Sequence, residues 1–423
     1  MKTLPMPLMR HLRQHFEVPA AIDVSAEFAL QWQDLRQTLA LTPGMRVAVG
    51  VGSRGIANLP RLVCTVIDAL REAGARPFVT PAMGSHGGAT PEGQMEVLRI
   101  RGITESSVGA PIRAGMETVS MGEVDGIPLF LDRLAAEAEG IVLINRVKPH
   151  TNFIGDTESG IMKMIAIGLG NQVGAEHYHR LSVVRDQYTI ISTAGRELLK
   201  RANFLFGVCL VENQDHRTCE LALLPPQSIE AGESRLLRKA KAILPTLPLQ
   251  EIDLLIVDEM GKDISGEGID PNVVGRDVCA YGVDRPSPEI TRIYVRDLTA
   301  ATEGSALGIG QADFTTQRLV EKIDFPVTAI NCLTACCPEA GKVPLAYASD
   351  REALAAAFMS IRPFTPNDLR LVHIRNTLNL NTLLVSEGCL EQLTGDRDLE
   401  PGREAFAYDF DQNGDLRVPC RLG

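Results

Sequence analysis

The chain has 423 residues, of which 45% are hydrophobic and 22% are charged, as is typical of a globular protein with two or three domains. A net charge of −11 without any run of Lys or Arg argues against nucleic-acid binding, and an aromatic content of 5% leaves few stacking platforms for single strands. No stretch reaches the roughly 18 apolar residues that a membrane span needs.

The N-terminus and the cysteines predict a cytoplasmic protein. Residues 1–7 lack the unbroken apolar region of a signal peptide. The nine cysteines are scattered along the chain without a disulfide framework, which fits a reducing compartment. Cys332, Cys336 and Cys337 lie close together but lack the C-x-x-C spacing of zinc sites, so we expect them to be thiols.

Short apolar runs alternate with helical patterns in the first half of the chain. The predicted elements are a strand over 46–51, a helix over 59–73 that ends at Gly74, a strand over 76–80, a glycine-rich loop over 83–88, a helix from Thr90, and a strand over 140–145. This alternation predicts a parallel sheet with helices on both faces.

The second half of the chain repeats the α/β pattern. Prolines at 245 and 248 predict a linker, residues 252–258 predict a new strand, and the apolar run 325–331 continues the alternation. The sequence therefore predicts two α/β domains with mainly parallel sheets, over 1–248 and 249–423, and a ligand site in the cleft between them.

Three polar residues directly follow predicted strands of the first domain. They are Arg54, His86 and His150. Because ligands bind beyond the carboxyl ends of the strands in such sheets, we expect these side chains on one edge.

The segment 50–55 matches the G-x-G-x-x-G fingerprint of dinucleotide-binding turns. That fingerprint also needs an acidic residue at the end of the next strand, which here ends in Thr80-Pro81. A tight strand-to-helix turn explains the glycines, and an NAD-dependent oxidoreductase stays as an alternative.

Half of the eight histidines fall in one stretch, in contexts rich in Gly, Ser or Thr: His86, His150, His177 and His179. Lys163 lies nearby within an otherwise apolar run. A lysine there must reach water, pair with a charge such as Asp156 or Glu158, or serve in chemistry.

This ordered set of motifs resembles the nickel-pincer lactate racemase family. The matching residues are Arg54 after the first strand, the Gly-flanked His86, Pro149-His150, Ser159-Gly160 before Lys163, and His179 sixteen residues beyond that lysine. The matches cover roughly residues 45 to 185, and the likeness is weaker elsewhere.

The resemblance implies a cofactor that holds nickel, a pyridinium-3,5-bisthiocarboxylic acid mononucleotide type of pincer. Lys163 would be its covalent attachment point, and His179, or alternatively His177, would be the nickel ligand, since imidazole suits nickel. Separate cofactor-biosynthesis proteins would be needed for loading, so a recombinant chain made without them would lack the group.

The resemblance also implies an isomerase that inverts the hydroxyl-bearing carbon of a small-molecule 2-hydroxy acid by hydride transfer. His86 and His150 would be a pair of general bases, one for each stereoisomer. Arg54 would bind the substrate carboxylate. In the second domain, the Gly-rich segment 259–276 carries Lys262 and Arg276, which we expect to contact the substrate or the cofactor phosphate.

Two departures from the family fall where substrate would lie. Gly52-Ser53 precede Arg54 where the family usually has Asp and Thr, and Gly87-Gly88 follow His86 where it usually has an arginine. These changes favour a 2-hydroxy acid larger than lactate. A non-catalytic metal- or anion-binding protein of the same fold is the remaining alternative.

Overall fold

The computed structural model describes residues 4–280, 282–283, 285 and 288–417. By their contacts these residues form two compact units, one over Val18–Leu244 and one from Pro245 onwards that also includes the N-terminal segment up to Glu17. The change of unit at Pro245 lies close to the boundary expected after residue 248. The N-terminal segment, expected in the first domain, belongs instead to the second unit.

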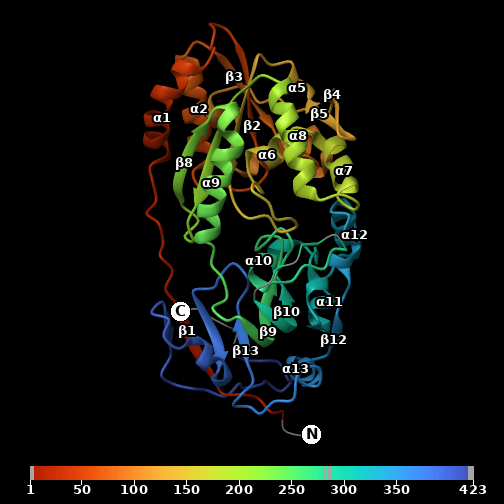
Figure 1. Cartoon of the computed structure of the whole chain (residues 1–423). Coiled ribbons are helices and arrows are strands. Elements are labelled where there is room, and N and C mark those ends of the chain that lie inside the picture. Colours follow the sequence, from red (N-terminus) through yellow and green to blue (C-terminus); the bar gives the residue numbers. More distant parts are fainter. Residues whose placement is uncertain (1–3, 281, 284, 286–287, 418–423) are drawn as a thin grey trace. The chain divides into compact units, whose positions relative to one another are not determined.

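The unit over Val18–Leu244 is built on a five-stranded sheet (Figure 1). Its order is β3 (Arg76–Pro81), β2 (Arg46–Val51), β6 (Gly140–Arg146), β7 (Phe204–Glu212) and β8 (Thr218–Leu224). The first four strands are parallel and β8 is antiparallel to β7. The predicted, mainly parallel α/β sheet is confirmed.

Helices cover both faces of this sheet (Figure 1). Val49 of β2 packs in one core with α1 and α2, whereas its neighbour Ala48 packs in another core with α8 and α9. The helices are α1 (Val24–Thr38), α2 (Leu59–Glu72), α3 (Pro91–Ile100), α4 (Glu105–Val108), α5 (Arg133–Ala136), α7 (Asn171–Leu181), α8 (Gln187–Arg201) and α9 (Ile229–Ala242). The unit also contains a hairpin of β4 (Thr118–Val124) and β5 (Ile127–Asp132), the short turns η1 (Gly87–Ala89) and η3 (Pro226–Ser228), and the helical segment that carries Lys163.

Local sequence signals set the helix ends where they were predicted. The helix α2 has Pro60 in its first turn and is followed by Gly74, whose φ of 87° stops the helix. The side chain of Thr90 caps α3 by accepting a hydrogen bond from the N–H of Gly93 at 3.0 Å.

The second unit contains an eight-stranded sheet. Its order is β12 (Leu345–Tyr347), β11 (Phe314–Thr316), β10 (Glu289–Leu298), β9 (Glu251–Met260), β13 (Leu371–Ile374), β14 (Thr382–Ser386), β1 (Met9–Gln14) and β15 (Leu399–Pro401). The strands from β12 to β13 are parallel, and each later pairing is antiparallel. The strand predicted over 252–258 is confirmed as β9.

The apolar run 325–331 is the start of a helix, α12 (Phe325–Thr334). Asp324 caps it by accepting from the N–H of Val327 at 2.9 Å, and Pro326 occupies its first turn. The other elements of this unit are α10 (Pro271–Val274), α11 (Gln317–Val320), α13 (Asp350–Phe358), η4 (Ala300–Thr302), η5 (Ile309–Gln311), η6 (Pro338–Gly341) and η7 (Glu387–Leu393).

The strand β1 explains why the N-terminus joins the second unit. It pairs antiparallel with β14 on one side and β15 on the other. Met9 and Leu12 of this strand are fully buried and belong to the cores on the two faces of the sheet. Hydrogen bonds and apolar burial therefore both tie this segment to residues far away in the sequence.

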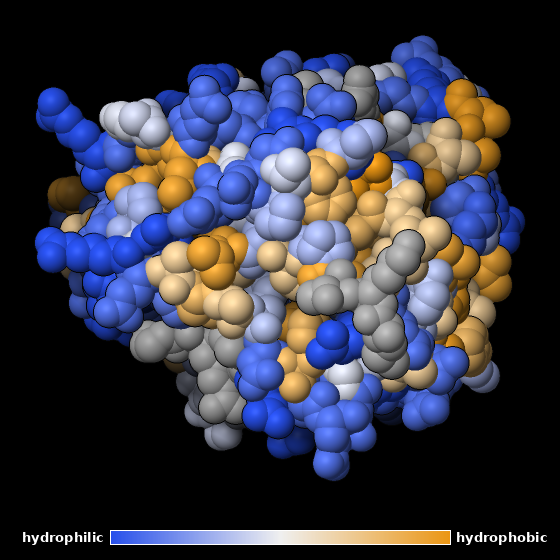
Figure 2. Space-filling view, turned by 90° about the horizontal axis from the view of Figure 1, so that it is seen from below, coloured by the Kyte–Doolittle hydropathy of each residue, from blue (hydrophilic) through white to orange (hydrophobic). Residues whose placement is uncertain are grey.

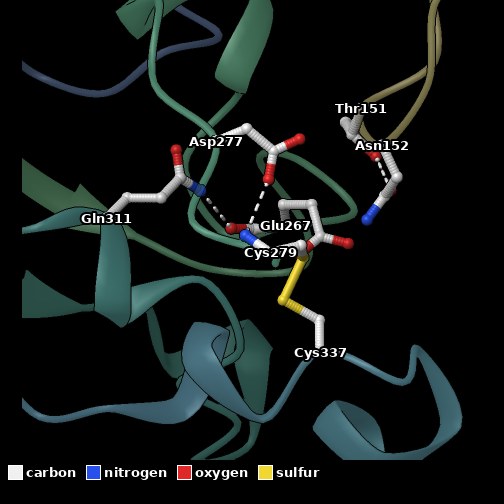
Figure 3. The surroundings of a disulfide bond; sticks show 7 residues. All are labelled: Thr151, Asn152, Glu267, Asp277, Cys279, Gln311 and Cys337. Carbon is white, nitrogen blue, oxygen red and sulfur yellow. Dashed lines mark hydrogen bonds between the residues drawn. A yellow bond between two sulfur atoms is a disulfide. The ribbon is translucent and has the colours of Figure 1, made fainter. Parts of the chain in front are cut away.

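A disulfide joins Cys279 to Cys337, whose Cα atoms are 5.2 Å apart (Figure 3). The expectation that Cys337 is a thiol is therefore wrong, while Cys332 and Cys336 are not disulfide-bonded. The two bonded residues lie 58 positions apart, so no local spacing signalled the pair. The N–H of Cys279 also donates to the carboxylate of Asp277 at 3.0 Å.

The described part of the chain contains no helix with the length and apolar character required to cross a bilayer. Figure 2 shows one face of the molecule, on which hydrophilic side chains surround several separate apolar patches.

Replacing Leu12 by Ala should destabilise the second unit by about 2 to 5 kcal/mol, because the buried side chain leaves a cavity in the core beside β14. Chemical denaturation of the full chain measures this change. The control is Arg13→Ala on the exposed side of β1, which should change the free energy of unfolding by less than about 0.5 kcal/mol. Equal effects would contradict the placement of β1.

Candidate functional site

The carboxyl ends of four parallel strands meet at one edge of the sheet in the unit over Val18–Leu244. In the β2–β3 and β2–β6 pairings, Val51 lies opposite Pro81 and Ile144, so the strands end at nearly the same level. The loops that follow carry Arg54, His86 and His150. The structure therefore brings these three loops to the same edge.

The loop that carries His86 is fastened to the segment that follows Lys163. The N–H of Gly84 donates to the carbonyl of Gly168 at 3.0 Å. The fully buried Gln94 of α3 holds the loop from the other side, since its amide donates to the carbonyl of Gly84 at 2.9 Å. The His86 side chain is exposed, and its Nδ1 lies 2.7 Å from the carbonyl oxygen of Met83.

The segment that carries His150 is organised by a buried carboxylate. One oxygen of Glu158 accepts a hydrogen bond from the N–H of His150 at 2.6 Å. Its other oxygen accepts from the N–H of Gly155 at 3.2 Å and pairs with Lys241 of α9 at 2.5 Å. Glu158, proposed above as a structural partner for Lys163, is thus paired with Lys241.

The ring of His150 is held on three sides and is only 9% exposed. It stacks on Phe153 with ring centroids 4.3 Å apart. Its Nδ1 accepts a hydrogen bond from the N–H of Asn152 at 3.0 Å, and its Nε2 contacts Nζ of Lys163. The Pro-His motif and Lys163, which lie 13 residues apart in the sequence, are therefore in direct contact.

Lys163 ends a short helix, α6 (Ile161–Lys163), which continues into the π-helical turn η2 (Met164–Gly168). All five residues of η2 are buried, so the apolar run around the lysine is core, and the lysine lies at its margin. Short π-helical turns are frequent at functional sites. Asn145 at the end of β6 donates to the carbonyl of Gly160 at 2.8 Å and so fixes the start of α6.

Glu233 of α9 contacts the backbone of α6, the short helix that ends at Lys163. It is fully buried, and its carboxylate accepts from the N–H of Met162 at 3.0 Å. A Cβ atom at Gly160 would lie 2.3 Å from this carboxylate, so only glycine fits there. Burial raises the pKa of Glu233 to about 7. The glutamate stands at an apolar position of α9, four residues from both Ile229 and Leu237, and that spacing is the sequence signal that marks it.

The structure distinguishes the two histidines of α7. Burial, together with the charges of Lys163 and His86, lowers the pKa of His179 to about 4, so its imidazole is neutral at physiological pH. His177 is exposed and packs against Phe130 with ring centroids 5.5 Å apart. His179 is therefore the one of the two that is near the lysine.

Arg54 is exposed in a loop that other residues hold in place. Glu212 at the end of β7 accepts from the N–H of Ala57 at 2.6 Å and forms an ion pair with Arg146. Arg101 donates to the carbonyl of Ser53 at 3.3 Å. The loop conformation thus keeps Arg54 at the carboxyl edge.

The glycine turn over 50–55 has a packing explanation. A Cβ atom at Gly50 would lie 2.4 Å from the side chain of Leu143 on the neighbouring strand. The helix α2 begins only at Leu59, beyond the turn, rather than inside it. The arrangement therefore differs from a dinucleotide-binding turn, in which the helix N-terminus receives the pyrophosphate.

The structure does not bring Lys262 and Arg276 together. Lys262 follows β9, and its Nζ donates to Asn331 at 2.7 Å while its N–H donates to Thr302 beyond the end of β10. The guanidinium of Arg276 donates to the carbonyl of Ile290 at 2.9 Å, at the start of β10, and pairs with Asp313 at 2.8 Å. At about 3.3 Å per residue, the two ends of β10 are more than roughly 20 Å apart.

Within the described residues, no group of three or more His, Cys, Asp or Glu side chains could hold a metal ion. The donor near Lys163 is the neutral imidazole of His179, with His86 also close enough to lower its pKa. A neutral imidazole is a donor that suits a transition metal such as nickel.

No family model matches the chain, and no curated protein matches it. Among solved structures, the chain is similar to the lactate racemase apoprotein from Thermoanaerobacterium thermosaccharolyticum. The TM-score is 0.46 at 12% identity, over 68% of this chain and 74% of that chain.

Replacing Glu233 by Gln should remove a pH dependence of stability. Because the folded-state pKa is raised from 4.5 to about 7, the native chain keeps a proton that the unfolded chain releases between these values. Wild-type stability should therefore fall, relative to the variant, as the pH rises through that window, by roughly 2 to 4 kcal/mol at about 1.4 kcal/mol per pKa unit.

Urea denaturation of both proteins, from below pH 4.5 to above pH 7, measures this difference. The matched control is Glu72→Gln at the exposed end of α2, which should leave the pH dependence unchanged. A constant difference between wild type and Glu233→Gln across the window would contradict the buried, proton-bearing state of Glu233.

Proposed function

We propose that the chain is a racemase or epimerase of a 2-hydroxy acid that works with a nickel-pincer nucleotide tethered to Lys163. The observation that carries this proposal is the contact between Nζ of Lys163 and Nε2 of His150 at the carboxyl edge, with His86 and the neutral imidazole of His179 nearby. A lysine beside several imidazoles on the binding edge of an α/β sheet is suited to chemistry rather than to stability.

The residues divide into those that would hold the cofactor and those that would handle the substrate. Lys163 would carry the group, and His179 would be the nickel ligand in preference to His177, which faces Phe130. When bound, the group supplies a reversible acceptor for hydride. Lys262 stays a predicted anion contact at the edge of the second sheet, whereas the guanidinium of Arg276 is engaged at the opposite end of β10.

The substrate residues follow from the chemistry of a 2-hydroxy acid. Arg54 would bind the carboxylate, since a guanidinium can form two parallel hydrogen bonds with it. His86 and His150 would exchange a proton with the hydroxyl group, which imidazole can do near neutral pH.

The loop after His86 supports a substrate larger than lactate. A Cβ atom at Gly87 would lie 2.6 Å from the backbone N of Gln94, and φ there is 67°, so the arginine usual in the family cannot fit. A Cβ atom at Gly88 would meet nothing within 4 Å, so there is open space beside His86. The missing arginine and this space favour a bulkier substituent on the hydroxy acid.

Co-production with pincer-building proteins should load the chain. We expect intact-mass analysis to show an adduct of cofactor size and metal analysis to show about one nickel per chain. Lys163→Ala should lose both, because it removes the attachment atom. His179→Ala should keep the adduct and lose most of the nickel, whereas the matched control His177→Ala should keep both.

If neither adduct nor nickel appears while a control racemase loads under the same conditions, the racemase proposal fails. Nickel without an adduct would instead support a metal-binding protein. Loaded protein should interconvert the stereoisomers of a 2-hydroxy acid, as followed by chiral chromatography of a panel that includes dicarboxylic and sugar acids.

A further inference from the structure

We propose that Arg101 is a specificity-determining residue that binds a second carboxylate of the substrate, so that the substrate class is a 2-hydroxy dicarboxylic acid. The part of this residue in a racemase rests on the proposed function, whereas the preference for a dicarboxylate can be measured on the chain without cofactor. The basis is the position of one guanidinium group against the loop that carries Arg54.

The backbone of Arg101 is fixed at the end of α3. Its N–H donates to the carbonyls of Val97 at 3.2 Å and Leu98 at 3.0 Å. Gly102 follows with a φ of 78°, which ends the helix, and the N–H of the buried Ile103 donates back to the carbonyl of Leu98 at 2.9 Å. The side chain of Arg101 therefore starts from a well-defined point.

The guanidinium group of Arg101 lies against the backbone on both sides of Arg54. Its Nε donates to the carbonyl of Ser53 at 3.3 Å. A Cβ atom at Gly55 would lie 3.3 Å from Nη1 and 3.7 Å from the central carbon of the guanidinium, so glycine leaves the space that this group occupies. Arg54 and Arg101 thus bring two guanidinium groups to one loop at the carboxyl edge.

The outer nitrogens of Arg101 keep their donors for a ligand. A guanidinium group has five N–H groups, of which the bond to Ser53 uses the one on Nε. In the part of the chain that the structure describes, nothing accepts a hydrogen bond from Nη1 or Nη2. Arg99, on the same helix, instead donates to both oxygens of Glu96 at 2.6 Å. Because the Arg101 side chain is exposed, its four remaining N–H groups are open to a ligand from solvent.

The carboxylate that holds this loop does not neutralise Arg101. Glu212 accepts from the N–H of Ala57 at 2.6 Å and forms its ion pair with Arg146. The chain as a whole has a net charge of −11, yet this loop presents two arginines at the edge of the sheet. Such a local excess of positive charge attracts anionic ligands.

Two guanidinium groups on one loop suit a substrate with two carboxylates. Lactate has one carboxylate, which Arg54 alone would bind. The open space at Gly88 favours a substituent larger than a methyl group, and Arg101 selects the charge of that substituent. A carboxylate forms charge-assisted hydrogen bonds with Nη1 and Nη2, which are stronger than those of a neutral sugar chain. The dicarboxylic acid is therefore the class that uses both arginines.

Calorimetric titration of the full chain without cofactor tests this preference, with malate and lactate as probes. We expect malate to bind more tightly than lactate. Arg101→Gln should weaken malate binding about tenfold, as expected for the loss of charge-assisted hydrogen bonds, and leave lactate binding unchanged within about twofold. Arg54→Gln should weaken the binding of both acids. The matched control Arg99→Gln, which removes a side chain paired with Glu96, should change neither.

Four results would overturn the proposal. Arg101→Gln could leave the affinity for malate unchanged, or it could weaken malate and lactate equally. The wild-type chain could bind lactate as tightly as malate, or it could bind neither acid at millimolar concentration. Thermal unfolding of each variant checks that the chain is folded before the affinities are compared.

Gly55→Val tests the placement of the guanidinium group without removing its charge. The added side chain would occupy the space of that group, so the ratio of malate to lactate affinity should fall toward the ratio of Arg101→Gln. In the double variant, the fall should be no greater than in Arg101→Gln alone, because both changes remove the same interaction. Additive losses would show that the two positions act separately and would contradict the placement.

The outcomes separate this proposal from the proposed function. A chain that binds malate through Arg101 but never loads the cofactor contradicts only the racemase. A chain that loads and racemises, but in which Arg101→Gln leaves the KM for malate unchanged, contradicts only the second carboxylate site. In loaded enzyme, Arg101→Gln should raise the KM for malate about tenfold with kcat nearly unchanged, because the lost contact lies away from the reacting carbon.

Discussion

The geometry at the carboxyl edge depends on one buried carboxylate. Glu158 is 1% exposed, and its two oxygens hold the N–H groups of His150 and Gly155 and the ammonium group of Lys241. A buried charge is tolerated only when it is paired and fully hydrogen-bonded. Removing Lys241 would leave the buried carboxylate of Glu158 without its cationic partner. Removing Glu158 would break the hydrogen bonds that hold the backbone of His150 and Gly155, and with them the position of the His150 ring beside Lys163.

The helix α9 stabilises the site through contacts beneath the loops that carry His150 and Lys163. It provides Lys241 to the His150 segment and Glu233 to the helix that ends at Lys163. The two buried carboxyl groups in these contacts, Glu158 and Glu233, differ in chemistry. Glu158 is paired with Lys241, whereas burial raises the pKa of Glu233 to about 7, so that the carboxyl group of Glu233 can remain neutral. Packing at Gly160 requires the backbone to pass directly against it.

The second unit stabilises its own carboxyl edge by a different device. Asp258 of β9 forms an ion pair with Arg296 of β10 and contacts Nε2 of His373 of β13 at 2.8 Å, and Arg296 also pairs with the fully buried Asp350 at 2.6 Å. In this network, each buried charged side chain at the ends of the parallel strands has a partner. The strand β9 was predicted from its local apolar run, whereas no local pattern predicts the disulfide between Cys279 and Cys337, 58 positions apart.

The sequence by itself determined the α/β class, the first strands and helices, and the loops that carry Arg54, His86 and His150, because these depend on periodicity, caps and strand ends. Only the tertiary structure decided which unit the N-terminal strand joins, that 325–331 is helical, and that Lys262 and Arg276 lie apart. It alone also revealed the partners of Glu158 and of the two histidine rings. Such contacts join residues far apart in the chain, and no local pattern encodes which distant atoms will meet.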